Sequence, residues 1–206
     1  SAASDVYKRQ AQNGGKPFPA EKFVNKIPVK KHDHVLIPAG TVHCSGADTM
    51  VLEISATPYI FTFKLWDWGR VDLDGKPRPI HLEHGAANIQ WYRNTEWVHR
   101  NLVNAVAEVY TGENGTVVRT GLHEREFLDT FRFTTSSTLP VHRNVSVHML
   151  NLVDGTRAVL RSKSDAFPPL ELHYAETCIV PQAAGDYEIS SPDGSEVKVI
   201  LACVRN

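Results

Sequence analysis

Short runs in which apolar and polar residues alternate dominate the C-terminal half of this 206-residue chain. Four of them flank two Asp-Gly dipeptides: 145–152 and 156–160 around Asp154-Gly155, and 187–190 and 196–204 around Asp193-Gly194. Asp-Gly and Asn-Gly tolerate the positive φ of two-residue hairpin turns. The pattern therefore predicts two antiparallel hairpins there and a further tight turn at Asn114-Gly115.

The first half of the chain combines extended runs with the clearest helical spacing. Strands are predicted at 50–55 and 59–66, and helices at 81–93 and 96–107, where apolar residues recur at helical intervals. Many short strands, frequent turns and little helix indicate an all-β fold, an antiparallel barrel or sandwich. A break near residues 94–105 indicates two β units with one or two short helices between them.

Composition and charge place the chain among ordinary globular proteins. Apolar residues make up 42% and charged residues 22%, which suffices for a core without disulfides or metals. The 22 basic and 23 acidic residues nearly cancel, so no basic surface for nucleic acid or membranes is expected. Three widely spaced cysteines (Cys44, Cys178 and Cys203) and the lack of a long apolar run favour a soluble protein of a reducing compartment, the cytoplasm.

The N-terminus of the chain is unusual. It begins at Ser1, and its methionines are Met50 and Met149. Residues 1–10 show no periodicity and no link to the sequence that follows, so we expect them to be foreign. We expect the rest to be the C-terminal portion of a longer protein.

The sharpest motif for chemistry is Pro38-x-Gly40-x-x-His43. A short apolar strand runs into a Pro-Gly turn, and His43 follows at the start of the next strand, where its imidazole could face the interior of a barrel. A neutral imidazole suits Zn, Fe, Ni or Mn, and a rigid turn would fix its direction. The alternative is a structural histidine that is hydrogen-bonded within a β-turn. The motif resembles the second cupin motif, in which the histidine is a metal ligand.

Four further motifs follow His43 in order and at close spacing. They are Leu52-Glu53-Ile54, Trp66-Asp67-Trp68-Gly69-Arg70, Asp74-Gly75-Lys76-Pro77-Arg78 and His81-Leu82-Glu83. Together with the histidine motif, the series resembles the class I mannose-6-phosphate isomerases, most strongly over residues 27–92. The resemblance implies a cupin-type antiparallel β-barrel or sandwich. Residues 11–95 would be the C-terminal part of a catalytic cupin with a short helix, and 96–206 a second cupin-like β domain without metal ligands.

The resemblance also implies a reaction, the interconversion of mannose 6-phosphate and fructose 6-phosphate by metal-assisted proton transfer. A divalent metal, usually zinc, polarises the sugar oxygens while a protein base moves the proton between C1 and C2. Of that family's metal ligands His43 is present, and the others are expected upstream of Ala11. Because zinc needs three or four protein ligands, we expect this chain alone to bind zinc poorly and to be inactive.

Two neighbouring histidines do not replace the missing ligands. The first cupin motif places a Glu four or five residues after its second histidine, and none follows His34 at that distance. His32 occupies a turn position before the strand. We therefore reject the pair as metal ligands and interpret His32 as a solvated turn histidine.

Lys64 and Arg70 are the residues to which the resemblance assigns catalysis and phosphate binding. In the family the first of these positions is an Arg. Lys64 lacks its planar two-point donor but can pair with a phosphate as a point charge. Their even spacing would place both on one face of a strand, provided that Gly69 introduces no bulge. The alternative is two ordinary surface cations.

Other residues near these motifs have both structural and functional interpretations. Glu53 could accept the second ring N–H of the liganding histidine or form a structural hydrogen bond within the barrel. Trp66 and Trp68 are interpreted as core residues rather than as a platform for a sugar ring. His81 and Glu83 are interpreted as helix-capping or surface residues.

Two rival functions remain. A non-catalytic sugar-binding or regulatory bicupin would explain Lys64 and the missing ligands as a loss of catalysis. An unrelated metal-dependent cupin oxygenase would explain the histidine motif alone. The isomerase interpretation expects a small sugar phosphate as partner, and neither nucleic acid nor a membrane. The sequence leaves the native sugar, the metal, the general base and the oligomeric state open.

Overall fold

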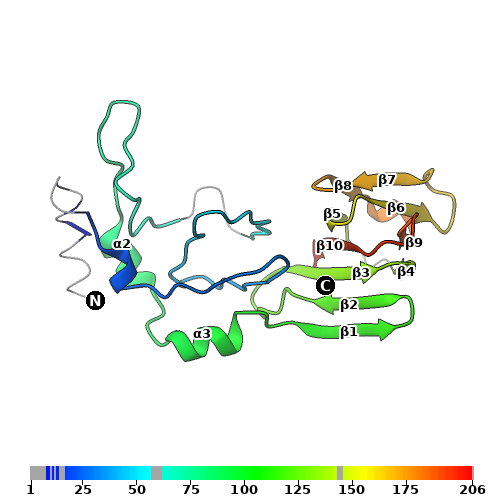
Figure 1. Ribbon diagram of the computed structural model, residues 1–206, viewed down its shortest axis with the longest axis horizontal. Coiled ribbons are helices and arrows are strands. Elements are labelled where there is room, and N and C mark those ends of the chain that lie inside the picture. Colours follow the sequence, from blue (N-terminus) through cyan, green and yellow to red (C-terminus); the bar gives the residue numbers. More distant parts are fainter. Residues whose placement is uncertain are drawn as a thin grey trace. The chain divides into compact units, whose positions relative to one another are not determined.

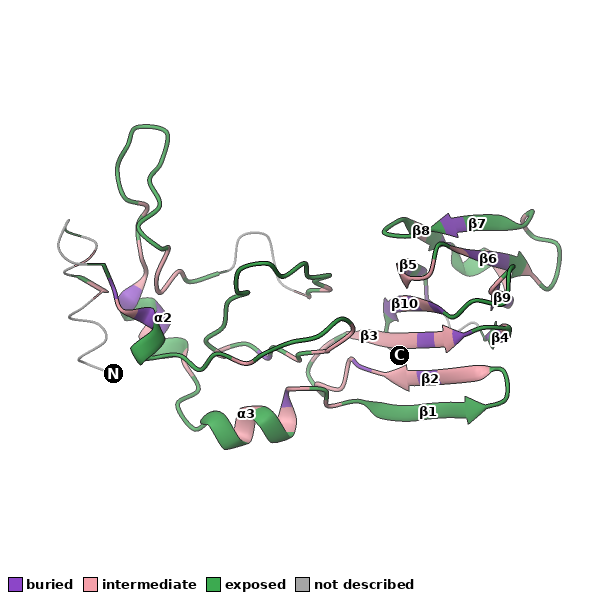
Figure 2. Cartoon of the chain, viewed as in Figure 1, coloured by how far each residue is buried: buried purple, intermediate pink, exposed green. Residues whose placement is uncertain are grey.

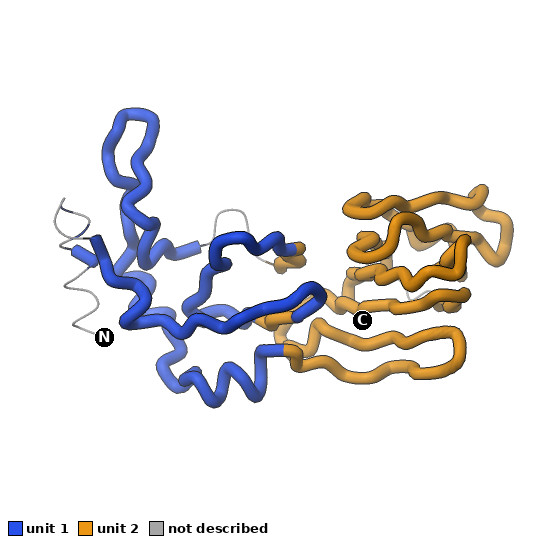
Figure 3. Tube along the Cα trace, in the orientation of Figure 1, with its two compact units in different colours: residues 1–33, 37–51, 57–103 blue, residues 34–36, 52–56, 104–206 orange. Residues whose placement is uncertain are grey.

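A computed structural model of the chain describes residues 8, 9, 11, 13, 17–56, 62–142 and 146–205. The chain divides into two compact units, which are drawn in different colours in Figure 3. The units are made of these segments: residues 1–33, 37–51 and 57–103 form unit 1, and residues 34–36, 52–56 and 104–206 form unit 2.

The named elements of unit 1 are short helices, and those of unit 2 are mainly strands (Figure 1). Unit 1 contains η1 (Ala20–Lys22), α2 (Leu82–Asn88) and α3 (Thr95–Asn101). Unit 2 contains β1 (Ala107–Gly112), β2 (Gly115–Arg119), β3 (Leu128–Thr135), β4 (Thr138–Val141), β5 (His148–Asp154), β6 (Arg157–Ser162), β7 (Leu170–His173), β8 (Thr177–Val180), η2 (Gln182–Ala184), β9 (Tyr187–Ser190) and β10 (Val197–Val204). Within the described ranges, no helix is long and apolar enough to cross a membrane.

Unit 2 is a sandwich of two antiparallel sheets. One sheet has the strand order β1-β2-β3-β10-β5-β8 and the other has the order β4-β9-β6-β7. Alternate residues of facing strands are fully buried between the sheets, among them Leu150 on β5, Leu160 on β6 and Ile189 on β9, each with an exposed fraction of 0%. Figure 2 shows buried positions on the strands of this unit. The predicted fold class, an all-β antiparallel sandwich, is confirmed.

Strand β10 lies in the middle of the larger sheet. Val199 pairs with Phe133 of β3 on one side and with Leu152 of β5 on the other. Because side chains alternate between the faces of a strand, one face of β10 supplies a continuous apolar row, with Val197 and Leu201 also buried. This strand therefore joins most of the larger sheet into one hydrogen-bonded layer.

The two Asp-Gly turns that were expected to close hairpins instead carry the chain from one sheet to the other. Strand β5 pairs with β8 and β10, whereas β6 pairs with β7 and β9. Strands β9 and β10 likewise belong to different sheets. Both hairpin predictions are wrong. Alternation of apolar and polar residues indicates only that one face of a strand is buried. It does not show whether the next strand in the sequence pairs with it in the same sheet or packs against it from the other sheet. The turn at Asn114-Gly115 does close a hairpin, since Gly112 pairs with Gly115.

The described part of unit 1 consists of helical turns and loops with isolated β-bridges such as that between Val71 and Pro77. Residues 50–55, predicted as a strand, are not assigned to one, and Met50 is 82% exposed. An extended segment becomes a strand only when a neighbouring backbone pairs with it. The strand predicted at 59–66 lies partly outside the described residues, and residues 62–66 are not paired as a strand. The sequence motifs also predict a partly open β-barrel over about residues 22–80, but the described residues of this range, 22–56 and 62–80, contain no named strand from which to build it.

Both predicted helices exist but are shorter than predicted. Helix α2 ends at Asn88 because Ile89 has extended backbone angles. Helix α3 begins after Asn94, whose side chain accepts a hydrogen bond from the backbone N–H of Trp97 at 3.0 Å. This contact satisfies one of the unpaired donors at the start of the helix.

Candidate functional site

The loop that carries His43 begins with the Pro-x-Gly turn. Gly40 has a φ of +82°, and a Cβ at this position would lie 2.5 Å from the carbonyl oxygen of Asn88. The backbone N–H of Gln90 donates to the carbonyl oxygen of Gly40 at 3.0 Å. Because an L side chain would be both strained and in collision here, only glycine fits this turn. The motif read from the sequence thus has a clear structural cause.

Arg93 holds the same turn from its side chain. Its Nη1 donates to the carbonyl oxygens of Pro38 and Ala39 at 3.1 and 2.8 Å, and to the hydroxyl of Thr41 at 2.5 Å. Its Cζ lies 5.5 Å from the ring centre of Tyr92 and 5.4 Å from that of Trp97. The sequence interpretation missed Arg93, and its only indication in the sequence was an arginine close to two aromatic residues.

His43 is exposed, and its ring is tied to its own turn. The Nδ1 atom lies 2.8 Å from the carbonyl oxygen of Thr41. A carbonyl oxygen can only accept, so Nδ1 carries the hydrogen and Nε2 carries the free lone pair. This is the tautomer that a histidine needs to ligate a metal through Nε2. The role of His43 as a ligand stays a prediction.

A complete metal centre is not built by the described residues. No group of three His, Cys, Asp or Glu side chains gathers there in a way that could hold a metal ion. Zinc requires three or four protein ligands. The residues that the structure describes therefore do not by themselves fit a zinc ion.

The two histidines before the strand differ from each other. His32 has a φ of +72° in a turn, as interpreted from the sequence. His34 belongs to unit 2, and its Nδ1 is buried. Burial, together with the positive charge of Arg132, lowers the pKa of His34 below its ordinary value. His34 is thus a half-buried histidine of unit 2, whereas His32 lies in a turn.

Lys64 and Arg70 do not share a strand. Trp68 and Gly69 have φ values of +55° and +68°, and the N–H of Arg70 donates to the carbonyl oxygen of Asp67 at 2.9 Å. Two consecutive positive φ values describe a tight turn that reverses the chain between the two cations. Trp68 is 57% exposed in this turn rather than part of a core, so its predicted role is wrong. Trp66 contacts Phe18 edge-on, with 5.4 Å between ring centres.

Asp67 brings Lys64 together with a different arginine. The Asp67 carboxylate, 13% exposed, lies 2.7 Å from Nε of Arg78 and 3.4 Å from Nζ of Lys64. The Arg70 side chain is exposed and has no ion-pair partner among the described residues. Arg78 belongs to the motif of residues 74–78, but no role was predicted for it from the sequence. Its position beside Asp67 depends on the reversal of the chain between the two residues.

His81 fixes the backbone of Lys64. Its Nδ1 accepts a hydrogen bond from the N–H of Lys64 at 3.1 Å, and its own N–H donates to the carbonyl oxygen of Lys64 at 2.7 Å. His81 stands at the N-cap position of α2, but its side chain makes no capping hydrogen bond to the helix. An open hollow of about 480 Å³ lies beside it, lined by Arg9, Asn13 and residues 79–84.

The remaining predicted residues are exposed. Glu83 forms a surface ion pair with Arg9 at 3.4 Å, in line with the surface role expected for it. Glu53 is exposed and belongs to unit 2, whereas His43 belongs to unit 1. The partnership of Glu53 with His43 stays a prediction.

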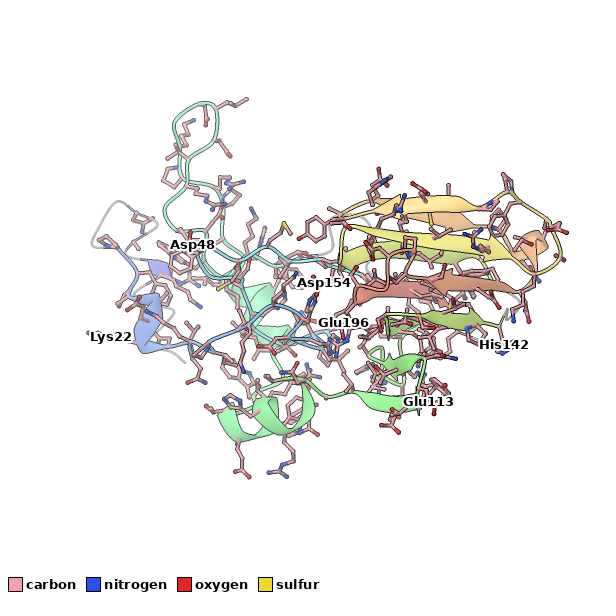
Figure 4. The ribbon with its side chains drawn as sticks, turned by 45° about the vertical axis from the view of Figure 1, so that its right-hand side comes forward. Lys22, Asp48, Glu113, His142, Asp154 and Glu196 are labelled. Atoms are coloured by element: carbon pink, nitrogen blue, oxygen red, sulfur yellow. The ribbon has the colours of Figure 1, made fainter. Side chains whose placement is uncertain are left out.

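Charged side chains of unit 2 form structural pairs at the ends of strands. Asp154 and Glu196, labelled in Figure 4, both pair with Nζ of Lys198, at 3.6 Å in the case of Asp154. Asp129 pairs with Arg119 and Arg205 through its Oδ1, at 2.6 and 3.0 Å from their Nη2 atoms. These pairs join neighbouring segments and do not converge on a cavity that the structure describes.

Comparison with known proteins supports the resemblance found in the sequence. The chain is 35% identical over 63 residues to mannose-6-phosphate isomerase of Streptococcus mutans, covering 31% of this chain and 20% of that protein. It is 33% identical over 70 residues to mannose-6-phosphate isomerase ManA of Bacillus subtilis, covering 34% of this chain and 22% of that protein. The chain thus spans about a fifth of the length of these curated relatives. No family model matches it.

A solved structure supports the fold. The crystal structure of mannose 6-phosphate isomerase from Bacillus subtilis superposes on 68% of this chain and 39% of its own, with a TM-score of 0.50 and 13% identity. At this level of identity the similarity shows a shared cupin-type fold. The predicted resemblance to mannose-6-phosphate isomerases is confirmed.

Proposed function

We propose that this protein is a sugar-phosphate isomerase of the mannose-6-phosphate isomerase type, which interconverts mannose 6-phosphate and fructose 6-phosphate. The observation that carries the proposal is the identity of 33–35% over 63–70 residues to curated enzymes of that name. His43 keeps its place in the proposal as a metal ligand through Nε2, with zinc as the expected metal. The described residues supply only this one ligand and no complete metal centre. The part of the function that they can explain is therefore the binding of the substrate.

Lys64 is the residue proposed to meet the phosphate or the reacting oxygens. Its side chain is 40% exposed, and its Nζ lies 3.4 Å from the carboxylate of Asp67, which also pairs with Arg78. The ammonium therefore has a defined place and still has donors free for an anion. Arg70, exposed on the far side of the tight turn, is proposed as a second and weaker contact to the phosphate.

Isothermal titration with mannose 6-phosphate and with mannose tests this binding. The chain is expected to bind the phosphorylated sugar more tightly, and Lys64→Gln is expected to remove most of that preference while leaving the binding of mannose unaffected. Lys76→Gln is the matched control, because Lys76 is 80% exposed and pairs with Asp74. Equal affinity of the parent chain for the two sugars would contradict the proposed phosphate contact.

A chimera tests the isomerase activity itself. Residues 27–92 replace the corresponding stretch of ManA of Bacillus subtilis, and conversion of mannose 6-phosphate is followed by NMR. Retained conversion, increased by Lys64→Arg, is the expected result. A folded chimera that binds the sugar phosphate without converting it would overturn the isomerase proposal in favour of non-catalytic sugar binding.

A further inference from the structure

The turn before His43 is held by the side chain of a single arginine, Arg93. Nη1 of Arg93 reaches three oxygens of the turn, on Pro38, Ala39 and Thr41, over distances of 2.5–3.1 Å. The guanidinium is also placed against the rings of Tyr92 and Trp97. Cation–π contacts with two rings restrict the position of the cation, so the turn is bound to a fixed point rather than to a free side chain.

Thr41 connects this fixed point to the imidazole. Its hydroxyl accepts from Arg93, and its carbonyl oxygen accepts from Nδ1 of His43 at 2.8 Å. The direction of that carbonyl is set by the conformation of the turn, which Arg93 and the contact between Gln90 and Gly40 hold. A carbonyl in a fixed direction selects the imidazole tautomer that donates from Nδ1.

We infer that Arg93 is a positioning residue that fixes the tautomer and the direction of His43. By holding the turn, it keeps the hydrogen on Nδ1 and leaves the Nε2 lone pair pointing away from the turn. The inference rests on the proposed function only where it assigns the Nε2 lone pair to a metal ion. The placement of the lone pair follows from the hydrogen bonds alone.

NMR of the chain with ¹⁵N-labelled histidine tests the inference without any ligand or activity. At a pH of about 8 free imidazoles are neutral, and one-bond and long-range ¹H–¹⁵N correlations show which ring nitrogen carries hydrogen. The His43 signals are identified as those lost in His43→Gln. The parent chain is expected to show Nδ1–H, and Arg93→Met is expected to give a mixture of both tautomers.

Matched variants separate positioning from folding. Arg93→Lys keeps a cation with several hydrogen-bond donors, so part of the His43 population should keep the parent tautomer. Thr41→Val removes one of the acceptors of Arg93. It should change the tautomer ratio of His43 less than Arg93→Met does. Arg100→Met is the control, since Arg100 is exposed and pairs with Glu96 on the same stretch. Should Arg93→Met fail to fold by circular dichroism, Thr41→Val and Arg93→Lys still decide.

Two results would overturn the inference. One is a parent His43 with hydrogen on Nε2, and the other is a folded Arg93 variant whose His43 signals match the parent. Equal affinity of the parent chain for mannose 6-phosphate and mannose, with the hydrogen of His43 on Nδ1, would instead count against the proposed function alone. The two proposals can therefore fail separately.

Discussion

The two units of this chain are ordered by different means. Unit 2 has a closed apolar core in which Leu150, Leu160 and Ile189 are fully buried. Unit 1 leaves Met50 and Trp68 largely exposed, and its described turns are held by side chains that bond to backbone, as Arg93 does. Apolar burial is spread over many residues, whereas a polar contact depends on one group. Single substitutions should therefore destabilise unit 2 globally but move the turns of unit 1 locally.

Leu160→Ala should give the largest effect, because it removes a fully buried side chain of β6. We expect the free energy of unfolding of unit 2 to fall by about 2–5 kcal/mol. Urea unfolding followed by circular dichroism of the strands measures it. Ile179→Ala is the control: Ile179 is 63% exposed, and the change should stay within about 0.5 kcal/mol. Equal effects of the two variants would contradict the core as described.

A pair of glycine variants compares the units directly. Gly155 and Gly75 have φ values of +86° and +75°, but a Cβ on Gly155 would lie 2.7 Å from Cγ1 of Val197, whereas none of the described atoms lies within 4 Å of one on Gly75. Gly75→Ala should cost about 1 kcal/mol from backbone strain alone, and Gly155→Ala roughly 2–3 kcal/mol. Calorimetry of both variants measures which one is destabilised more. A larger loss of stability in Gly75→Ala would contradict the described packing of the turn between β5 and β6.

The alternation of apolar and polar residues made the β-sandwich predictable from the sequence. The pairing partners of each strand could not be predicted in this way. Strand β5 buries alternate residues, whereas three consecutive residues of β6 are buried. Which strands become partners is decided by the packing of the whole core. The glycine of the Pro-x-Gly turn was equally readable, because Gly40 serves a local backbone need.

The contacts that complete the site depend on positions far apart in the chain. Arg93 reaches a turn more than fifty residues earlier, and its sequence context does not distinguish it from a surface cation. The pairing of Lys64 with Arg70 failed because Trp68 adopts a positive φ, which a bulky side chain rarely does. That reversal brings Arg78, rather than Arg70, to Asp67.

His34 should give unit 2 a mild sensitivity to acid. Burial lowers the pKa of His34 in the folded chain, so the unfolded chain binds the proton more readily. Its contribution to stability is complete above the ordinary histidine pKa of about 6.5 and is lost as the pH falls through the lowered value. Unfolding free energies measured across this range should fall less steeply in His34→Gln. The exposed His99, changed to Gln, should leave the slope unchanged.

Thiol labelling gives the smallest and most local comparison. Cys44 in unit 1 is exposed, whereas burial raises the pKa of Cys178 in unit 2 to about 11. Since the thiolate is the reactive form, iodoacetamide at a pH of about 9 should modify Cys44 well before Cys178, as mass spectrometry can show. In Cys44→Ser the fast reaction should disappear. Rapid modification of Cys178 in folded protein would contradict its burial.

The central place of β10 has a consequence for how the chain is made. Its neighbours β3 and β5 are synthesised before it, and each keeps an unpaired edge until β10 is inserted between them. Contacts between such distant segments form slowly, and an open strand edge is a site for pairing with other chains. The sandwich is therefore completed only after β10 has been synthesised, and aggregation competes with folding in the interval before β10 emerges.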